Sequence, residues 1–98
     1  MSYEFDATLY LWDATSGSWV FVDLPFDVAD EIEDAQTGPR RGFGSVRVEV
    51  TVGGTTWRTS IFPSKERRTF VLPVKKAVLK AESLAPDQTA RFRLDTIS

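Results

Sequence analysis

The stretch SVRVEVTVGGTTWRTSIF, residues 45–62, decides the fold. Its first half alternates strictly, with a valine at every second position, which is typical of a strand that is buried on one face. Two glycines follow, and a two-residue turn at this point fixes which residues of the two strands lie opposite each other. In that register Val50 faces Trp57 on the inner side. Glu49 then faces Arg58 on the outer side. Because the turn and the alternation agree, we predict an antiparallel hairpin.

The other elements follow from periodicity on either side of this hairpin. Alternating runs predict strands at residues 3–12, 19–24, 69–72 and 89–94. A helix follows Pro25 and another follows Pro73, since proline suits the first helical turn. The inner faces of these helices are marked by apolar residues at helical spacing: Val28, Ile32 and Ala35 in the first, and Val74, Ala77, Val78 and Ala81 in the second. The expected fold class is mainly β with two short helices, in the order ββαβββαβ, in a single domain over residues 1–98.

One local pattern occurs twice. FVDLPFDVAD, at Phe21 to Asp30, and FVLPVKKAV, at Phe70 to Val78, both run from a strand through Leu-Pro into an amphipathic helix. Leu-Pro is a common way to pass from strand to helix, so two short matches can also arise by chance. If the repeat is structural, the two halves form a closed, pseudo-symmetric sheet with a helix at each end.

Composition excludes several classes of site. The chain has 98 residues, a formal charge of −2, and neither cysteine nor histidine. It therefore has no thiolate nucleophile, no disulfide, and neither of the two residue types that most often bind transition metals. The sequence also contains no phosphate-binding glycine motif and no apolar run of membrane-spanning length. We expect a cytoplasmic domain that is not an enzyme and holds no metal and no cofactor.

Charge is distributed unevenly along the chain. Residues 1–36 contain nine acids and no base, whereas residues 37–98 contain all twelve bases and five acids. Such a split indicates either opposed charged faces or parts that attract each other within one domain. The second interpretation is the simpler one, because it needs no partner.

The bases concentrate further between Arg40 and Lys80. Ten bases in this segment stand against two acids, and the aromatic residues Phe43, Trp57 and Phe62 are interleaved with them. This pattern is found in proteins that bind single-stranded nucleic acid. The acidic first third opposes that function, because it repels phosphate, and Trp57 is predicted to face inward. Nucleic-acid binding by residues 40–80 is therefore the alternative function, and the family resemblance described below would make such a domain a regulator or antitoxin-like.

Two tryptophans are candidates for contact with a protein partner. Trp12 and Trp19 flank the first predicted turn. Large aromatic side chains at such positions either pack across the hairpin or anchor an interface. Both readings stay open at this point.

Four bases are candidates for an anion site. Lys75 and Lys76 stand at the start of the second helix, where positive charge opposes the helix dipole unless something negative lies near. The acidic first helix is one source of that charge. The other is an anionic ligand or partner, which the two lysines would hold together with Arg40 and Arg41 from a loop that faces them in the expected barrel. The function we expect is non-catalytic binding of a small anionic ligand or a protein partner.

Three separated segments resemble one known family, in the family's own order. LPFDVADEI, RRGFGSVRVEVTVGGTTWRTSIFPSK and VLPVKKAVLKAE resemble the small prokaryotic domain-of-unknown-function family nineteen-hundred-and-five, over nearly the whole chain from Tyr3 to about Leu94. The resemblance implies a double-split β-barrel, grouped with transition-state regulators and antitoxins of the AbrB type. It implies no activity, because the family has none assigned, although members are sometimes fused to a domain associated with bacteriocin protection.

The chain departs from this family at two turns. Family members tend to have glycine before the strand that leads into the second Leu-Pro, where this chain has Arg67-Arg68-Thr69. Many have Gly-Asp before the last strand, where this chain has Pro86-Asp87. Both differences affect turn geometry more than fold.

Overall fold

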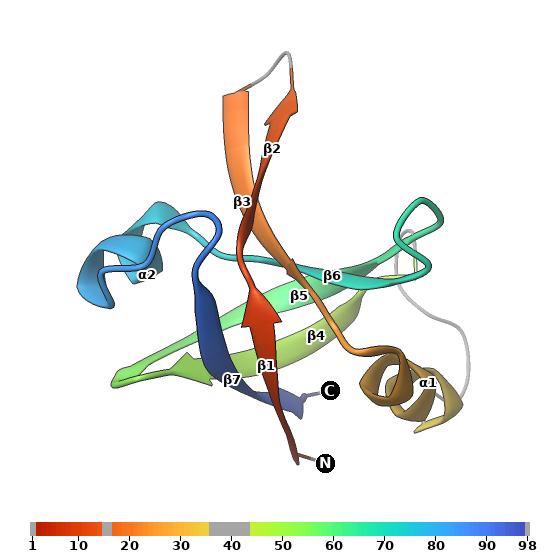
Figure 1. Ribbon diagram of the computed structural model, residues 1–98. Helices are drawn as coiled ribbons and strands as arrows, with labels where there is room; N and C mark the ends of the chain where they lie inside the picture. The colour runs from red at the N-terminus through yellow and green to blue at the C-terminus, as the bar shows by residue number, and fades with distance from the viewer. Residues whose placement is uncertain (1, 15–16, 36–43, 98) are drawn as a thin grey trace.

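The computed structural model describes residues 2–14, 17–35 and 44–97, and in these ranges the chain forms seven strands and two helices (Figure 1). The strands are β1 (Ser2–Thr8), β2 (Tyr10–Ala14), β3 (Gly17–Asp23), β4 (Val46–Val52), β5 (Thr55–Ser64), β6 (Thr69–Pro73) and β7 (Thr89–Thr96). The helices are α1 (Phe26–Ala35), which follows β3, and α2 (Lys76–Ala81), which follows β6. The predicted class, mainly β with two short helices, is confirmed, with one strand more than expected.

The predicted strand over residues 3–12 is two strands that separate at Leu9. The backbone N–H of Leu9 donates to the Gln88 carbonyl at 2.8 Å, and its carbonyl accepts from the Asp87 N–H at 2.7 Å, so Leu9 is held by the loop before β7. β1 then pairs with β7, whereas β2 pairs with β3. The alternation of residues 3–12 places Leu11 on the same face as Tyr3, Phe5 and Leu9, but beyond this break Leu11 is half exposed, so the prediction of one continuous strand is wrong.

All seven strands belong to one antiparallel sheet, in the order β1-β7-β4-β5-β6-β3-β2. The sheet curls, but β1 and β2 lie at its two ends and do not pair, so it is an open half-barrel (Figure 1). The predicted closure of the barrel is wrong. The reason is covalent: a single residue joins β1 to β2, and antiparallel neighbours need a turn of at least two residues between them.

The predicted β4–β5 hairpin is confirmed in its register. Val50 lies opposite Trp57, and both side chains are buried. On the outer face Arg58 Nε donates to Glu49 Oε2 at 3.1 Å. The turn takes a positive φ of 57° at Gly53, a conformation that glycine adopts without steric cost.

Helix α1 covers one end of the sheet and closes the core there. It buries Val28, Ala29 and Ile32, while Ala35 is exposed, contrary to the prediction. The helix ends at Ala35, so this residue lies beyond the last turn that contacts the sheet. Together with the inner face of the strands, α1 encloses one hydrophobic core among the described residues.

Helix α2 is shorter than predicted and begins later. Pro73 does not open it, because Pro73 is still part of β6 and pairs with Phe21. The helix starts at Lys76 and buries only Val78. Two alanines that were predicted to face the core are therefore exposed: Ala77 and Ala81.

An approximate twofold relates the two strand–helix units, β3–α1 and β6–α2. β3 and β6 are antiparallel neighbours, and two equivalent backbone hydrogen bonds flank their pairing. Leu24 N–H donates to the Phe70 carbonyl at 3.0 Å, and Val74 N–H donates to the Val20 carbonyl at 2.9 Å. Leu24 thus corresponds to Val74, not to the leucine of the second Leu-Pro. A helix does lie at each end, as predicted (Figure 1), but the repeated Leu-Pro is not the symmetric element.

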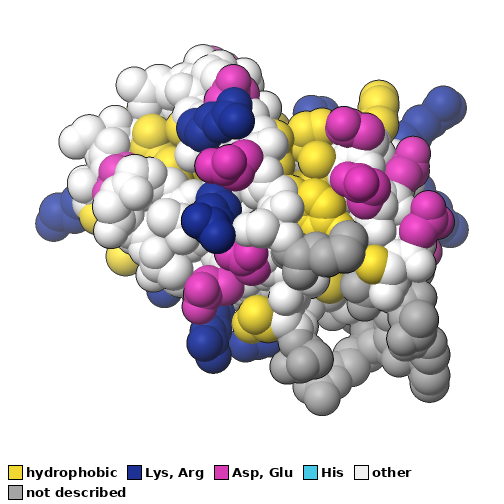
Figure 2. Space-filling view, turned by 90° about the horizontal axis from the view of Figure 1, so that it is seen from below, with side chains coloured by type: hydrophobic (Ala, Val, Ile, Leu, Met, Phe, Trp, Pro, Cys, Tyr) yellow, Lys and Arg dark blue, Asp and Glu magenta, His cyan; other side chains and the backbone are white. Residues whose placement is uncertain are grey.

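Charges from the two parts of the chain mix on the surface. Of the four ion pairs among the described residues, two join the acidic first third to later bases. They are Asp6 with Arg91, at 3.4 Å, and Asp23 with Arg67, at 2.8 Å. Figure 2 shows dark-blue and magenta side chains interleaved across the middle of the molecule, with further magenta side chains gathered on the side of α1. Attraction within the fold therefore accounts for part of the charge split.

Neither described helix could cross a membrane, because both are too short and too polar.

Candidate binding surface

The β2–β3 hairpin projects beyond the body of the sheet and carries both candidate tryptophans (Figure 1). Trp12 and Trp19 lie directly opposite each other in the pairing of β2 with β3. Each side chain remains about half exposed, at 50% and 51%. They therefore pair across the hairpin without entering the core, and the reading that they anchor an interface stays a prediction.

These tryptophans belong to a larger exposed surface, which we call the aromatic face. It consists of five aromatic side chains from three strands: Tyr10, Trp12, Trp19, Phe21 and Phe62. Phe21 is central, because its ring centroid lies 6.2 Å from that of Tyr10 and 6.0 Å from that of Trp12. Phe62 joins from β5 across Val71 of β6. A shallow depression of about 450 Å³ runs between the two tryptophans and Phe62.

The sequence carries a signal for this face, but a search for alternating residues does not reveal it. The segments Tyr10-Leu11-Trp12 and Trp19-Val20-Phe21 are apolar at consecutive positions. Since neighbouring strand residues point to opposite faces, such segments are apolar on both sides. A hairpin of this kind at the end of a sheet must leave one apolar side exposed or cover it with something else.

A polar cluster fixes one end of the aromatic face. The Tyr10 hydroxyl donates to Asp23 Oδ1 at 2.7 Å, and Arg67 Nε donates to Asp23 Oδ2 at 2.8 Å. The Arg67 guanidinium also stacks over the Tyr10 ring, 4.4 Å from its centroid. Burial, and then the hydrogen bond to Asp23, raise the pKa of Tyr10 well above its ordinary value. Tyr10 is thus held as a neutral hydrogen-bond donor, and its ring is fixed in place.

This cluster was not predicted from the sequence. Arg67 follows Tyr10 by more than fifty positions, and only the adjacency of β3 and β6 brings it to Asp23. Tyr10 and Arg67, with Trp12 and Glu66, line a second depression of about 240 Å³.

The structure describes two of the four bases that were predicted to bind an anion. Arg40 and Arg41 lie outside the described residues. Lys75 is the N-cap of α2, Lys76 is its first residue, and both are exposed. They line a groove of about 630 Å³ between α2 and the hairpin, which Trp19 also lines. The structure therefore brings one candidate tryptophan, Trp19, to the two candidate lysines, while Trp12 does not line this groove.

The acidic helix α1 does not supply the charge that these lysines were expected to need. α1 and α2 lie on opposite sides of the molecule (Figure 1). Every ion pair among the described residues uses an arginine, so neither Lys75 nor Lys76 has a carboxylate partner in that part of the chain.

The bases of segment 40–80 do not gather into one patch within the described residues. The β5–β6 turn, which carries Lys65 and Arg68, lies on the side of the molecule opposite to α2 (Figure 1). Arg58 and Arg67 are each paired with a carboxylate. Trp57 faces the core, as predicted, so it offers no base-stacking surface. Phe43 lies outside the described residues.

Carboxylate clusters and buried polar groups were the remaining places to look for a site among the described residues. No three carboxylates among them are arranged to hold a metal ion. Within the same ranges every buried polar side-chain atom has a hydrogen-bond partner. The one buried polar residue there is Thr69, and its hydroxyl donates to the Leu24 carbonyl at 2.9 Å.

Comparison with known proteins gives a family and no activity. No curated protein matches the chain. A family model described as "Domain of unknown function (DUF1905)" matches residues 5–94, which is almost the whole sequence and confirms the resemblance seen in its three motifs. The chain therefore belongs to the DUF1905 family.

Proposed function

We propose that this domain is a non-catalytic interaction module that binds an extended segment of a protein partner along β2 and the aromatic face. The observation that carries this proposal is the exposure of Trp12 and Trp19, side by side on a projecting hairpin. Tryptophan and tyrosine are the side chains that most often dominate the energy of protein interfaces. Here they stand in one continuous group and not as scattered surface residues.

The free edge of β2 supports an extended partner. β2 ends the sheet, and within the described part of the chain it pairs with β3 alone, so the other edge of its backbone has no strand partner there and can accept a further strand. β1, the strand at the other end, carries the exposed acids Glu4 and Asp6 on its outer face, which discourage strand addition. In β2 the residues before Asp13 are all apolar, and Tyr10 and Trp12 lie next to the edge.

The shape and charge of the face also favour a protein partner. Its depressions are shallow, whereas small-molecule sites usually enclose most of their ligand. Arg67 and Asp23 neutralise each other beside it, so no excess of positive charge attracts phosphate. Between Gly44 and Lys80 the bases are dispersed over several sides of the molecule, and this arrangement does not favour the nucleic-acid alternative.

A selection of random peptides displayed on phage tests this proposal. We expect the wild-type domain to enrich peptides that alternate apolar side chains. Trp12→Ala and Trp19→Ala should each weaken the recovered peptides at least tenfold, because each removes a central anchor. Phe26→Ala is the matched control. Phe26 is an aromatic residue that is 65% exposed on α1, away from the hairpin, and its loss should change nothing.

Backbone N-methylation of the recovered peptide tests strand addition separately. Methyl groups on the amides that face β2 should abolish binding, because they remove the donors of the new ladder. The proposal is overturned if no peptide is enriched, or if enriched peptides bind the tryptophan variants as tightly as the wild type. Binding that tolerates N-methylation at every amide would exclude strand addition.

A further inference from the structure

A groove of about 630 Å³ lies between α2 and the β2–β3 hairpin. This volume falls within the range of sites that bind small molecules. Its walls are mainly apolar. They are formed by Leu11 and Val20 from the inner side of the hairpin and by Val74, Ala77 and Leu79 from the α2 side.

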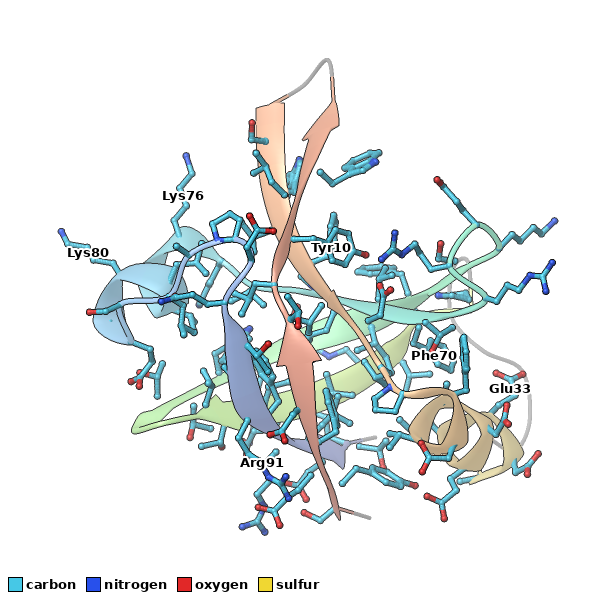
Figure 3. All side chains as sticks on the ribbon, in the orientation of Figure 1. Tyr10, Glu33, Phe70, Lys76, Lys80 and Arg91 are labelled. Atoms are coloured by element: carbon cyan, nitrogen blue, oxygen red, sulfur yellow. The ribbon has the colours of Figure 1, made fainter. Side chains whose placement is uncertain are left out.

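Positive charge meets this apolar groove in one place. Lys75 and Lys76 line it where α2 begins, and neither has a carboxylate partner among residues 2–14, 17–35 and 44–97. Figure 3 shows Lys76 pointing in the direction in which the hairpin projects, whereas Lys80, on the same helix, points away from the hairpin. The groove thus combines a long apolar wall with two unneutralised ammonium groups.

The combination of apolar walls and two lysines limits the chemical class of ligand that can bind. Ser18 is the one uncharged polar residue among the described residues that line the groove, so few groups here can recognise a sugar or a peptide backbone. An apolar chain fits the walls, and an anionic head group complements the lysines. We infer that this groove binds a single-chain anionic amphiphile, a fatty-acid carboxylate, with its head group at Lys75 and Lys76.

This site is separate from the aromatic face. Tyr10 points toward the side of the β5–β6 turn, while Lys76 stands on the other side of the hairpin (Figure 3). Trp19 borders both surfaces, but Trp12 borders only the aromatic face. Variants of Trp12 and of the two lysines therefore distinguish failure of this inference from failure of the proposed function.

Titration calorimetry with octanoate, decanoate and dodecanoate, each below its micelle concentration, tests the inference. We expect affinity to rise roughly four- to fifteenfold for each two added methylenes, depending on how much of the chain is buried. Dodecanol and dodecyltrimethylammonium have the same chain with a neutral or a positive head group. They should bind roughly three- to tenfold more weakly than dodecanoate, or worse.

The variants locate the head group. Lys75→Ala with Lys76→Ala should weaken dodecanoate roughly three- to tenfold, and Lys75→Glu with Lys76→Glu should weaken it further. Lys80→Ala, the matched control on the same helix, should leave affinity unchanged. Leu11→Asp should abolish binding, because it places a negative charge within the apolar wall. Since these side chains are exposed or half exposed, unchanged melting temperatures should accompany the losses.

Several results would overturn the inference. Dodecanol that binds as tightly as dodecanoate would show that the lysines recognise no anion. A loss of affinity in Lys80→Ala equal to that in the double variant would mean unspecific attraction. A loss in Trp12→Ala without one in the lysine variants would place the chain on the aromatic face. Absence of binding by all three carboxylates would reject the site outright.

Discussion

The two hairpins β4–β5 and β2–β3 place their tryptophans in opposite environments, buried in the first and exposed in the second. In β4–β5 the alternation is clean, so Trp57 and the valines face the core and the charged residues face water. In β2–β3 apolar residues occupy consecutive positions, and the curled sheet covers only one side of them. Trp57 is 7% exposed, while Trp12 and Trp19 are about half exposed. A strand that alternates strictly buries its apolar side within its own fold, whereas a strand that is apolar on both sides leaves one apolar side exposed, and we propose that a partner covers it.

The largest expected effect tests the structural half of this comparison. Trp57→Ala should destabilise the domain by roughly 3 to 5 kcal/mol and Val50→Ala by about 2 kcal/mol, because both changes leave a cavity in the core. Urea unfolding of the two variants and of the double variant measures these costs and their coupling. The two residues are direct neighbours in the register, so the double variant should lose less than the sum.

Additive costs in this cycle would mean that Val50 and Trp57 do not share one packing site. The β4–β5 hairpin could then no longer serve as the well-packed reference with which β2–β3 is compared. Thr56→Ala is a control on β5, since Thr56 is exposed on the outer face and should cost far less.

The sequence predicts β4–β5 well because everything that defines this hairpin is local. Its turn, alternation and charge pair lie within eighteen consecutive residues, and neighbours in the chain are neighbours in space. The break at Leu9 is different. It depends on backbone bonds to Gln88 and Asp87, almost eighty residues away, and no period in residues 3–12 reveals them. The expectation of a closed barrel came from the repeated Leu-Pro pattern and the family resemblance, and neither of them reveals this break or the two free sheet ends, β1 and β2.

The candidate site also combines residues that local sequence identifies with contacts that only the tertiary structure reveals. Trp12 and Trp19 were found from the sequence because they flank one local turn. Lys75 and Lys76 were also found, but their expected acidic partner was misplaced, because only tertiary structure shows α1 and α2 on opposite sides of the molecule. The contribution of Phe62 to the aromatic face required the pairing of β5 with β6 and of β6 with β3.

A smaller effect tests how the exposed hairpin is attached to the body. Tyr10→Phe should cost about 1 kcal/mol at neutral pH, since it removes a part-buried hydrogen bond while Asp23 keeps its bond to Arg67. The cost should also depend on pH. The pKa of Tyr10 is raised in the folded state, so the folded protein retains this proton at pH values where the unfolded chain has lost it.

The sign follows from that difference in bound protons. The contribution of Tyr10 is fully present below its unfolded pKa of about 10 and declines as the pH rises above it. Unfolding of wild type and Tyr10→Phe should therefore converge in stability at alkaline pH. The pKa of Tyr3 is raised too, by burial and then by Glu31, and Tyr3 is present in both proteins, so the difference between them isolates Tyr10. If the difference in unfolding free energy between wild type and Tyr10→Phe stayed constant from pH 8 to alkaline pH, the raised pKa of Tyr10 would be contradicted.

The smallest effect compares the turn of β4–β5 with the turn that joins β5 to β6. Both need a residue with positive φ, which is Gly53 at 57° in the first and Arg68 at 61° in the second. A side chain in this conformation brings its Cβ close to the backbone at a cost of roughly 1 to 2 kcal/mol, which glycine avoids. Glycine also makes the unfolded chain more flexible, which offsets part of the gain.

Arg68→Gly should therefore stabilise the domain by about 0.5 to 1 kcal/mol, measured as a higher urea midpoint with an unchanged slope. Arg68→Ala is the matched control, because it removes the same guanidinium but keeps the Cβ that causes the strain, so it should gain nothing. If the alanine variant were as stable as the glycine variant, the gain would come from the lost charge beside Lys65. If both variants were less stable than wild type, the arginine side chain itself would hold this turn, and the backbone account of it would be wrong.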